Sequence, residues 1–163
     1  MPVLHLPDPA ATERAGAALA SVLRAGMVIT LSGDLAAGKT TLARGALRAL
    51  GWTGSVKSPT YTLVEHYFVS SLYFYHFDFY RFANLEEWET AGLAEYFRSD
   101  AVCLVEWPER VAGLLPAPDI ELVLAHREHP LAGRDLFIHS TTPAGERCKS
   151  AIAAVLERLP AKP

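Results

Sequence analysis

The chain has 163 residues, an apolar share of 50% and a formal net charge of −3. The length suits one domain of ordinary size, and the apolar share excludes a disordered chain, which needs low hydrophobicity and high net charge. The acidic balance excludes a protein that grips nucleic acid mainly through its own electrostatics. Because no run of about 18 apolar residues is present, we expect no membrane span. Cys103 and Cys148 lack metal or redox spacing, and we expect a cytoplasmic protein.

The first third of the chain alternates helical and strand patterns. Apolar residues at helical spacing over residues 15–23 predict a helix that Gly26 ends. The apolar run at residues 27–32 is typical of a parallel strand covered on both faces. A glycine-bounded loop, residues 33–38, then leads into a second helical pattern over residues 42–50.

The middle of the chain is rich in aromatic residues. Two strand-like runs, residues 62–69 and 72–80, are separated by two serines and predict an antiparallel hairpin. Alternation with period two places His76 and Asp78 on the face that Phe74 shares, and the intervening aromatic residues on the other face.

The remaining predicted elements are a helix over residues 84–94 with Asn84 as its N-cap, strands over 101–105, 120–126 and 135–139, and a helix over 144–159. Strands interleaved with helices, together with a hairpin, predict a three-layer α/β fold with a mixed sheet. No repeat, low-complexity tract or linker divides the chain, so we expect residues 1–163 to form a single domain.

The most informative segment is residues 33–40, GDLAAGKT, which fits the phosphate-loop pattern GxxxxGK[ST] without a gap. Its glycines let the backbone turn N–H groups inward around phosphates, and the next helix adds its N-terminal partial positive charge. In this pattern Lys39 reaches the β- and γ-phosphates, and the hydroxyl of Thr40 takes a Mg²⁺ coordination position. Chance alone produces such a string in about 1% of chains of this length, which favours the functional interpretation.

A phosphate loop supplies only part of the ligands that Mg²⁺ needs. An acidic residue is therefore expected at the end of a neighbouring buried strand. Glu106 directly follows the apolar strand 101–105, and Asp78 lies near the end of the second hairpin strand. Taken alone, either carboxylate also fits a solvated strand end. Together with the phosphate loop, both become candidates for the metal site or for positioning water.

Other polar residues favour structural roles when they are taken alone. The loop at residues 58–62 fits a Ser-Pro turn that opens a strand better than a loop that senses the γ-phosphate. His76 fits a packed or surface histidine, and Trp107 fits the core. His126 and His129 fit a hairpin loop, and we assign no metal to them.

Motifs that the sequence lacks limit which nucleotide it binds and which reaction it catalyses. Guanine-specific enzymes use Asn-Lys-x-Asp and Asp-x-x-Gly elements, and neither occurs, so ATP is favoured over GTP. A small-molecule kinase stays open as an alternative, although Arg127 and Arg134 are a weak basis for its arginine-rich lid. Arg44 and Arg48, four residues apart, fit a solvated helix face, with a docking surface as the alternative.

Four motifs in order resemble one family: GDLAAGKTTLARGALRALG at 33–51, VKSPTYTLVE at 56–65, YHFDFYR at 75–81 and VEWPER at 105–110. They look like the TsaE family, formerly YjeE, the bacterial ATPases of tRNA threonylcarbamoyladenosine biosynthesis. The resemblance runs from about residue 6 to about residue 140. It implies a P-loop NTPase fold and a Mg²⁺-dependent ATPase that acts with the TsaB and TsaD proteins. In that family TsaD transfers the threonylcarbamoyl group to tRNA, and the resemblance implies that this ATPase drives turnover of the complex.

Carried over by position, the resemblance implies roles for several residues. Phosphates should be wrapped by the loop residues Gly33, Ala36, Ala37, Gly38, Lys39, Thr40 and Thr41. Thr40 and Glu106 should serve Mg²⁺, Thr60 should sense the γ-phosphate, and Asp78 should position the attacking water or the metal. Trp107 should pack beside the site, and the adenine pocket should lie near Pro9 and Arg134.

The sequence departs from the family at Ala36, where glycine is usual. If this position requires a positive φ, alanine strains the loop by roughly 1 kcal/mol or more, and we expect nucleotide binding to survive. No arginine finger is assigned, so hydrolysis should be slow without partners. We expect tRNA to be reached only through the complex, with no strong nucleic-acid binding by the chain alone. A non-hydrolysing, ATP-dependent docking module remains a second alternative.

Overall fold

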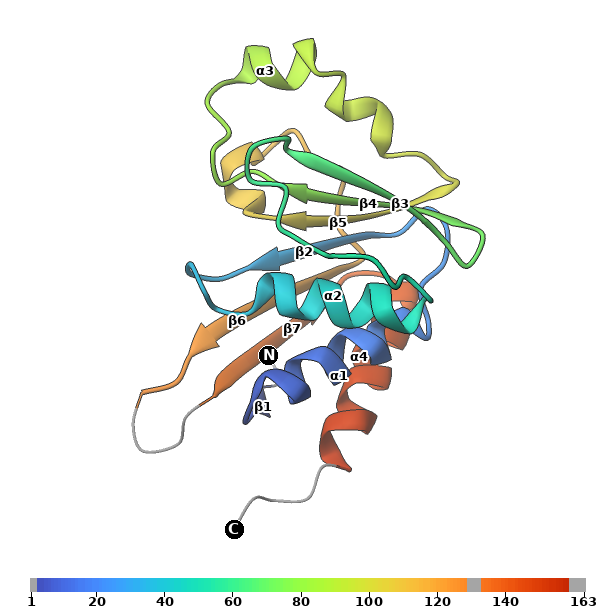
Figure 1. Ribbon diagram of the computed structural model, residues 1–163, viewed down its shortest axis with the longest axis vertical. Coiled ribbons are helices and arrows are strands. Elements are labelled where there is room, and N and C mark those ends of the chain that lie inside the picture. The colour runs from blue at the N-terminus through green and yellow to red at the C-terminus, as the bar shows by residue number, and fades with distance from the viewer. Residues whose placement is uncertain (1–2, 129–132, 159–163) are drawn as a thin grey trace.

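The computed structural model describes residues 3–128 and 133–158, which form a seven-stranded sheet with helices on its faces (Figure 1). In chain order the elements are β1 (Val3–Leu6), α1 (Pro9–Ala20), β2 (Val28–Ser32), α2 (Lys39–Ala49), β3 (Val64–Val69), β4 (Leu72–Asp78), α3 (Leu85–Thr90), the 3₁₀ turn η1 (Leu93–Tyr96), β5 (Ala101–Glu106), the 3₁₀ turn η2 (Pro108–Val111), β6 (Ile120–His126), β7 (Arg134–Ser140) and α4 (Pro143–Glu157).

The sheet is mixed, with the strand order β1-β7-β6-β2-β5-β4-β3. Its centre is parallel, because β2 pairs in parallel with β5 and β6, and β5 pairs in parallel with β4. Both edges are antiparallel, through the β3–β4 hairpin on one side and β6, β7 and β1 on the other. Because these strands are parallel, the carboxyl ends of β2, β4 and β5 lie at the same end of the sheet. Open α/β sheets bind their ligands at this end of the strands.

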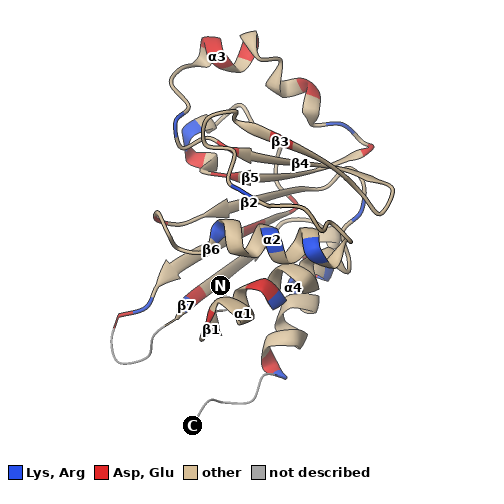
Figure 2. Cartoon of the chain, in the orientation of Figure 1, with Lys and Arg blue, Asp and Glu red and all other residues tan. Residues whose placement is uncertain are grey.

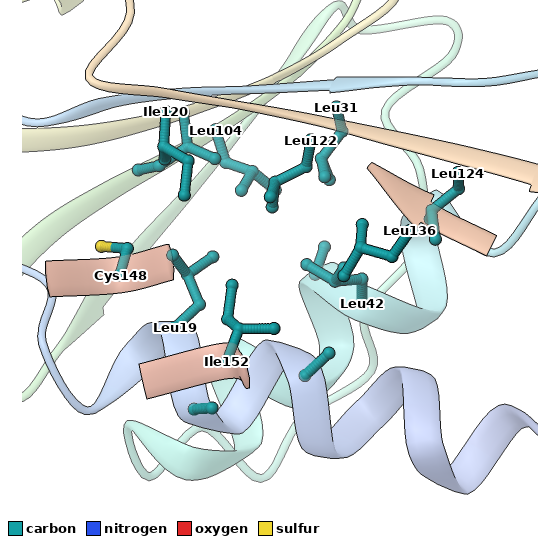
Figure 3. Close-up of a cluster of buried hydrophobic side chains, with 14 of the residues drawn as sticks. Leu19, Leu31, Leu42, Leu104, Ile120, Leu122, Leu124, Leu136, Cys148 and Ile152 are labelled. Atoms are coloured by element: carbon teal, nitrogen blue, oxygen red, sulfur yellow. The ribbon is translucent and has the colours of Figure 1, made fainter. Parts of the chain in front are cut away.

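Helices α1, α2 and α4 cover one face of the sheet (Figure 1). Their apolar residues pack against leucine and isoleucine side chains of the strands, as the close-up of this core shows (Figure 3). Leu42 of α2, Leu19 of α1 and Ile152 of α4 are all completely buried there. This packing fixes α2, and with it the loop that precedes α2, against the central strands.

The other face of β4 and β5 carries an aromatic core covered by α3 and the two 3₁₀ turns (Figure 1). Tyr75, Phe77 and Phe79 belong to this second core, whereas Phe74 belongs to the first. The period-two prediction for this strand is confirmed, and so is the α/β fold with a mixed sheet, an antiparallel hairpin and three layers. None of the described helices is both long enough and apolar enough to span a membrane.

The main differences from the sequence predictions lie in β1, α1, the two hairpin strands and α3; of the hairpin strands, β3 begins at Val64 instead of residue 62. Strand β1 was not predicted; its four residues pair with β7, which lies far away in the sequence. Helix α1 begins at Pro9, with the Asp8 side chain as its N-cap, and ends at Ala20. Strand β4 ends at Asp78 instead of residue 80. The helix predicted over 84–94 is divided, because Gly92 adopts a φ of 62° between α3 and η1.

Candidate functional site

The loop between β2 and α2 has the backbone shape that its glycines predict. Gly33 has a φ of 145°, and a Cβ at this position would stand 2.4 Å from the carbonyl oxygen of Leu124. Gly38 has a φ of 106° and is the N-cap of α2. The first N–H groups of a helix have no intrahelical acceptor, so the start of α2 offers donors and partial positive charge to an anion.

Ala36 has the strained conformation that the sequence departure suggested, with a φ of 62°. The guanidinium of Arg134 donates to the carbonyl oxygens of Ala36 at 3.2 Å and Ala37 at 3.1 Å. The ring Nε2 of His126 lies 3.3 Å from the carbonyl oxygen of Leu35. Side chains from β6 and β7 therefore bind three consecutive carbonyls of the loop and hold it from outside.

Lys39, the first residue of α2, is 5% exposed, and its Nζ donates to the carbonyl oxygens of Gly33 at 2.5 Å and Asp34 at 2.8 Å. The ammonium also lies 4.5 Å from the ring centroid of Trp107. Burial lowers the pKa of Lys39 below its ordinary value, and the negative charges of Glu106 and Asp78 oppose this shift. The Lys39 ammonium is thus a largely desolvated cation where the loop joins α2.

Asp78 and Glu106 stand side by side at the ends of β4 and β5, where their Cα atoms are register partners. They are 4% and 2% exposed. The hydroxyl of Ser58 donates to Oδ2 of Asp78 and lies 3.4 Å from Oε2 of Glu106. Oδ1 of Asp78 accepts from the backbone N–H of Tyr80 at 2.9 Å, and Oε2 of Glu106 lies 2.5 Å from Nε2 of His76.

These groups surround a cavity of about 680 Å³, the main cavity. It is lined by Leu35, Ala36, Ala37, Gly38, Lys39, Thr40, Thr41, Ser58, Thr60, Asp78, Tyr80, Arg81, Glu106 and Trp107. Segments that are far apart in sequence meet here: the phosphate-loop segment, the loop 58–62 and the ends of β4 and β5. Every residue that the sequence analysis placed around phosphates or Mg²⁺, except Gly33, lines this cavity.

A second cavity of about 330 Å³ adjoins the main one and shares Ala36, Ala37, Gly38 and Thr41 with it. Pro9 and Arg134, the two residues expected near an adenine pocket, line this second cavity together. The two cavities thus meet along the loop and the first turn of α2.

The chemistry of the main cavity fits a divalent cation. Thr40 offers a hydroxyl oxygen, and Asp78 and Glu106 offer two carboxylates, which are the hard oxygen ligands that Mg²⁺ prefers. Among the buried charged groups of the cavity, two carboxylates stand against one lysine, which leaves negative charge for a cation to balance. No cluster of three or more His, Cys, Asp or Glu residues suited to a metal is found in residues 3–128 and 133–158.

Three residues of this site carried too little sequence signal to be selected. In the sequence Ser58 stands out only as part of a Ser-Pro turn, His76 fits a packed or surface histidine, and Arg81 is only the last residue of the motif at 75–81. Arg81 lines the main cavity, and its guanidinium lies 4.6 Å from the ring centroid of Tyr61, which is 82% exposed. Each residue stands within three positions of a candidate already chosen, which is the signal that could have found it.

Other candidates have structural contacts. Arg44 donates to the carbonyl oxygen of Val56 at 3.4 Å, and Arg48 donates to that of Trp52 at 2.8 Å and to that of Gly54. The two arginines therefore hold the segment that follows α2. His129 lies outside the described residues.

Fold and site together define the class: an α/β protein with a mixed sheet, in which a turn of the phosphate-loop pattern joins a central parallel strand to a helix beside two buried carboxylates. The model of the TsaE family, described as threonylcarbamoyl adenosine biosynthesis protein TsaE, matches residues 6–135. The chain belongs to this family.

Individual relatives agree with the family match. The chain is 40% identical over 154 residues to the tRNA threonylcarbamoyladenosine biosynthesis protein TsaE of Haemophilus influenzae. This alignment covers 91% of this chain and 96% of the relative. It is 40% identical over 117 residues to the protein of the same name from Bacillus subtilis, covering 72% of this chain and 73% of the relative. The crystal structure of YdiB from Bacillus subtilis superposes with a TM-score of 0.76 at 28% identity and covers 94% of both chains. The resemblance deduced from the four motifs is thereby confirmed.

Proposed function

We propose that the chain binds and hydrolyses ATP with Mg²⁺, and that it does so as the ATP-using subunit of tRNA threonylcarbamoyladenosine biosynthesis, together with TsaB and TsaD. The observation that carries this proposal is the meeting of Lys39, Thr40, Thr60, Asp78 and Glu106 in one cavity. The names of the relatives support the biosynthetic role. The reaction is transfer of the γ-phosphoryl group to water.

Each residue has a role that its position supports. Loop N–H groups and Lys39 hold the triphosphate, and Lys39 exchanges its present carbonyl partners for phosphate oxygens. Thr40 and Glu106 hold Mg²⁺, which when bound neutralises charge on the phosphate oxygens. Asp78 orients the attacking water or contributes to the metal site, and Thr60 contacts the γ-phosphate. Catalysis comes mainly from positive charge preorganised around the phosphates.

The second cavity supports a place for the adenosine part of ATP. It lies across the loop from the carboxylates, and Pro9 and Arg134 line it. A nucleotide with its phosphates beside Lys39 would extend over Gly38 and Thr41, the residues that both cavities share.

The decisive experiment measures phosphate release by the purified chain alone, and then mixed with TsaB, TsaD and tRNA. We expect slow release alone and acceleration in the mixture, because a charge stabiliser supplied in trans is worth about 10³–10⁵ in rate. Lys39→Ala should lose hydrolysis under both conditions, whereas Lys149→Ala, a lysine change on α4, should retain it. Equal turnover with and without the partners would contradict the proposed dependence on them.

The same experiment separates the two alternatives. A small-molecule kinase would transfer phosphate to a metabolite, which a screen for phosphorylated products detects, and would release little free phosphate. A docking module would assemble with its partners when ATP is present and release no phosphate under any condition.

A further inference from the structure

His76 and Glu106 form a buried pair beside the main cavity. The His76 side chain is completely buried, and its Nε2 lies 2.5 Å from Oε2 of Glu106. His76 is the register partner of Leu104, so Glu106 stands two residues further along β5, on the same face of the sheet. His76 does not line the cavity, and the imidazole therefore acts on a ligand there only through Glu106.

The packing of the sheet does not require a histidine at this position. Nδ1 of His76 is the one buried side-chain nitrogen or oxygen without a hydrogen-bond partner in the described part of the chain. A buried polar atom without a partner costs free energy, so an apolar side chain of similar size would suit the surrounding core better. The imidazole makes its polar contact with Glu106. The role of the histidine therefore concerns that carboxylate.

The two oxygens of Glu106 have different surroundings. Oε2 contacts His76 and lies 3.4 Å from the hydroxyl of Ser58. Oε1 has no hydrogen-bond partner within residues 3–128 and 133–158, and Glu106 lines the cavity, so Oε1 is the oxygen left for a ligand. An ionised carboxylate can only accept, and in the neutral imidazole Nε2 must then carry the hydrogen.

We propose that His76 is a positioning residue for Glu106: its Nε2–H holds Oε2 and so presents Oε1 to the cation in the main cavity. This inference rests on the proposed function, in which Glu106 serves Mg²⁺. Hydrogen-bond partners of metal-binding carboxylates typically change metal affinity by about 10- to 100-fold when they are removed, and His76 should act within this range.

The test compares His76→Gln with His76→Met in the full chain. The amide nitrogen of glutamine replaces Nε2 and can still donate to Oε2, whereas methionine has similar length and no donor. Mn²⁺ serves as the probe for the Mg²⁺ site, and its binding is measured by electron paramagnetic resonance with a non-hydrolysable ATP analogue present. Calorimetry with EDTA measures affinity for the analogue without metal.

We expect His76→Met to weaken Mn²⁺ binding by about 10-fold or more, with unchanged affinity for the analogue in EDTA. His76→Gln should restore Mn²⁺ binding close to that of the parent chain. A purely structural histidine would not separate metal affinity from nucleotide affinity in this way. His76→Asn, whose amide stops at the Nδ1 position and cannot reach Oε2, should behave like His76→Met and replaces it if the methionine variant fails to fold.

Two results would overturn the positioning role: Mn²⁺ binding by folded His76→Met or His76→Asn equal to that of the parent, or a loss that His76→Gln does not restore. Failure of the proposed function gives a different result. In that case the parent chain itself would bind neither the analogue nor Mn²⁺, and the positioning role would be overturned together with the metal site.

Discussion

Three residues of the phosphate-loop segment have positive φ values, and two of them, Gly33 and Ala36, stand in different surroundings. Gly33 could not carry a side chain, since its Cβ would meet the carbonyl oxygen of Leu124 at 2.4 Å. Ala36 already carries one at a φ of 62°, a left-handed conformation that costs an L-residue roughly 1–2 kcal/mol. The bonds from Arg134 to the carbonyls of Ala36 and Ala37 help to hold this conformation. The loop therefore tolerates strain at one position and would not tolerate a clash at the other.

We expect Gly33→Ala to lower the free energy of unfolding by about 1–3 kcal/mol, because backbone strain and the clash with Leu124 add together. Ala36→Gly should change it by less than about 1 kcal/mol, since relief of strain is opposed by the greater freedom of glycine in the unfolded chain. Urea unfolding of both variants beside the parent chain measures the difference. A Gly33→Ala variant as stable as the parent would refute the loop geometry described above.

At the scale of elements, the sequence predicts a helix or strand correctly where an apolar run ends at a distinctive residue, such as a glycine or an acidic residue. Strand β2, its loop and α2 were predictable from an apolar run followed by glycines, and Glu106 from its place after the apolar run of β5. Strand β1 was not, because its four residues depend on pairing with β7. The contacts of Ser58 and His76 with the two carboxylates arise only when β4 and β5 lie side by side, so spacing in the sequence could not reveal them.

Strand β5 and helix α4 each contain one buried thiol, Cys103 and Cys148, and these report on the packing of their elements. Burial raises the pKa of Cys103 to about 12 and that of Cys148 to about 11, from an ordinary value of 9.0. Since only the thiolate is reactive, both thiols should react only slowly with a disulfide reagent at pH 8 in the native protein. Both should react at once in denaturant.

In the native protein, slow labelling should reach Cys148 before Cys103, because α4 is held on the sheet by side-chain packing whereas β5 is hydrogen-bonded to strands on both of its sides. Mass spectrometry of labelled peptides over time gives this order. Since the folded pKa values lie above the unfolded ones, the stabilising contribution of both thiols is complete below about pH 9 and declines as the pH rises toward 11 and 12. Faster labelling of Cys103 would show that the sheet opens before the helix leaves it.

At the scale of the whole molecule, helices α2 and α3, which lie on opposite faces of the sheet, carry charges of opposite sign (Figure 2). Helix α2 has three basic residues and no acidic one, whereas α3 has three acidic residues and no basic one. Arg44 and Arg48 of α2 are engaged with backbone carbonyls, and Lys39 is buried. Helix α2 thus has little free positive charge to offer a polyanion, and the net charge of the chain is −3.

Binding of tRNA by the isolated chain should therefore be weak, with half-saturation no lower than about 100 μM at physiological salt, the weak end of non-specific binding. Fluorescence anisotropy with labelled tRNA measures this. The matched control changes three exposed acidic residues on α3 and η1 to lysine, Glu86, Glu89 and Glu95, which turns the net charge from −3 into +3. This variant should bind more tightly at 50 mM salt and lose that gain at 200 mM, as counterion release requires. Saturable micromolar binding by the parent chain would mean that the fold carries an RNA surface of its own, and the partners would then not be the sole route to tRNA.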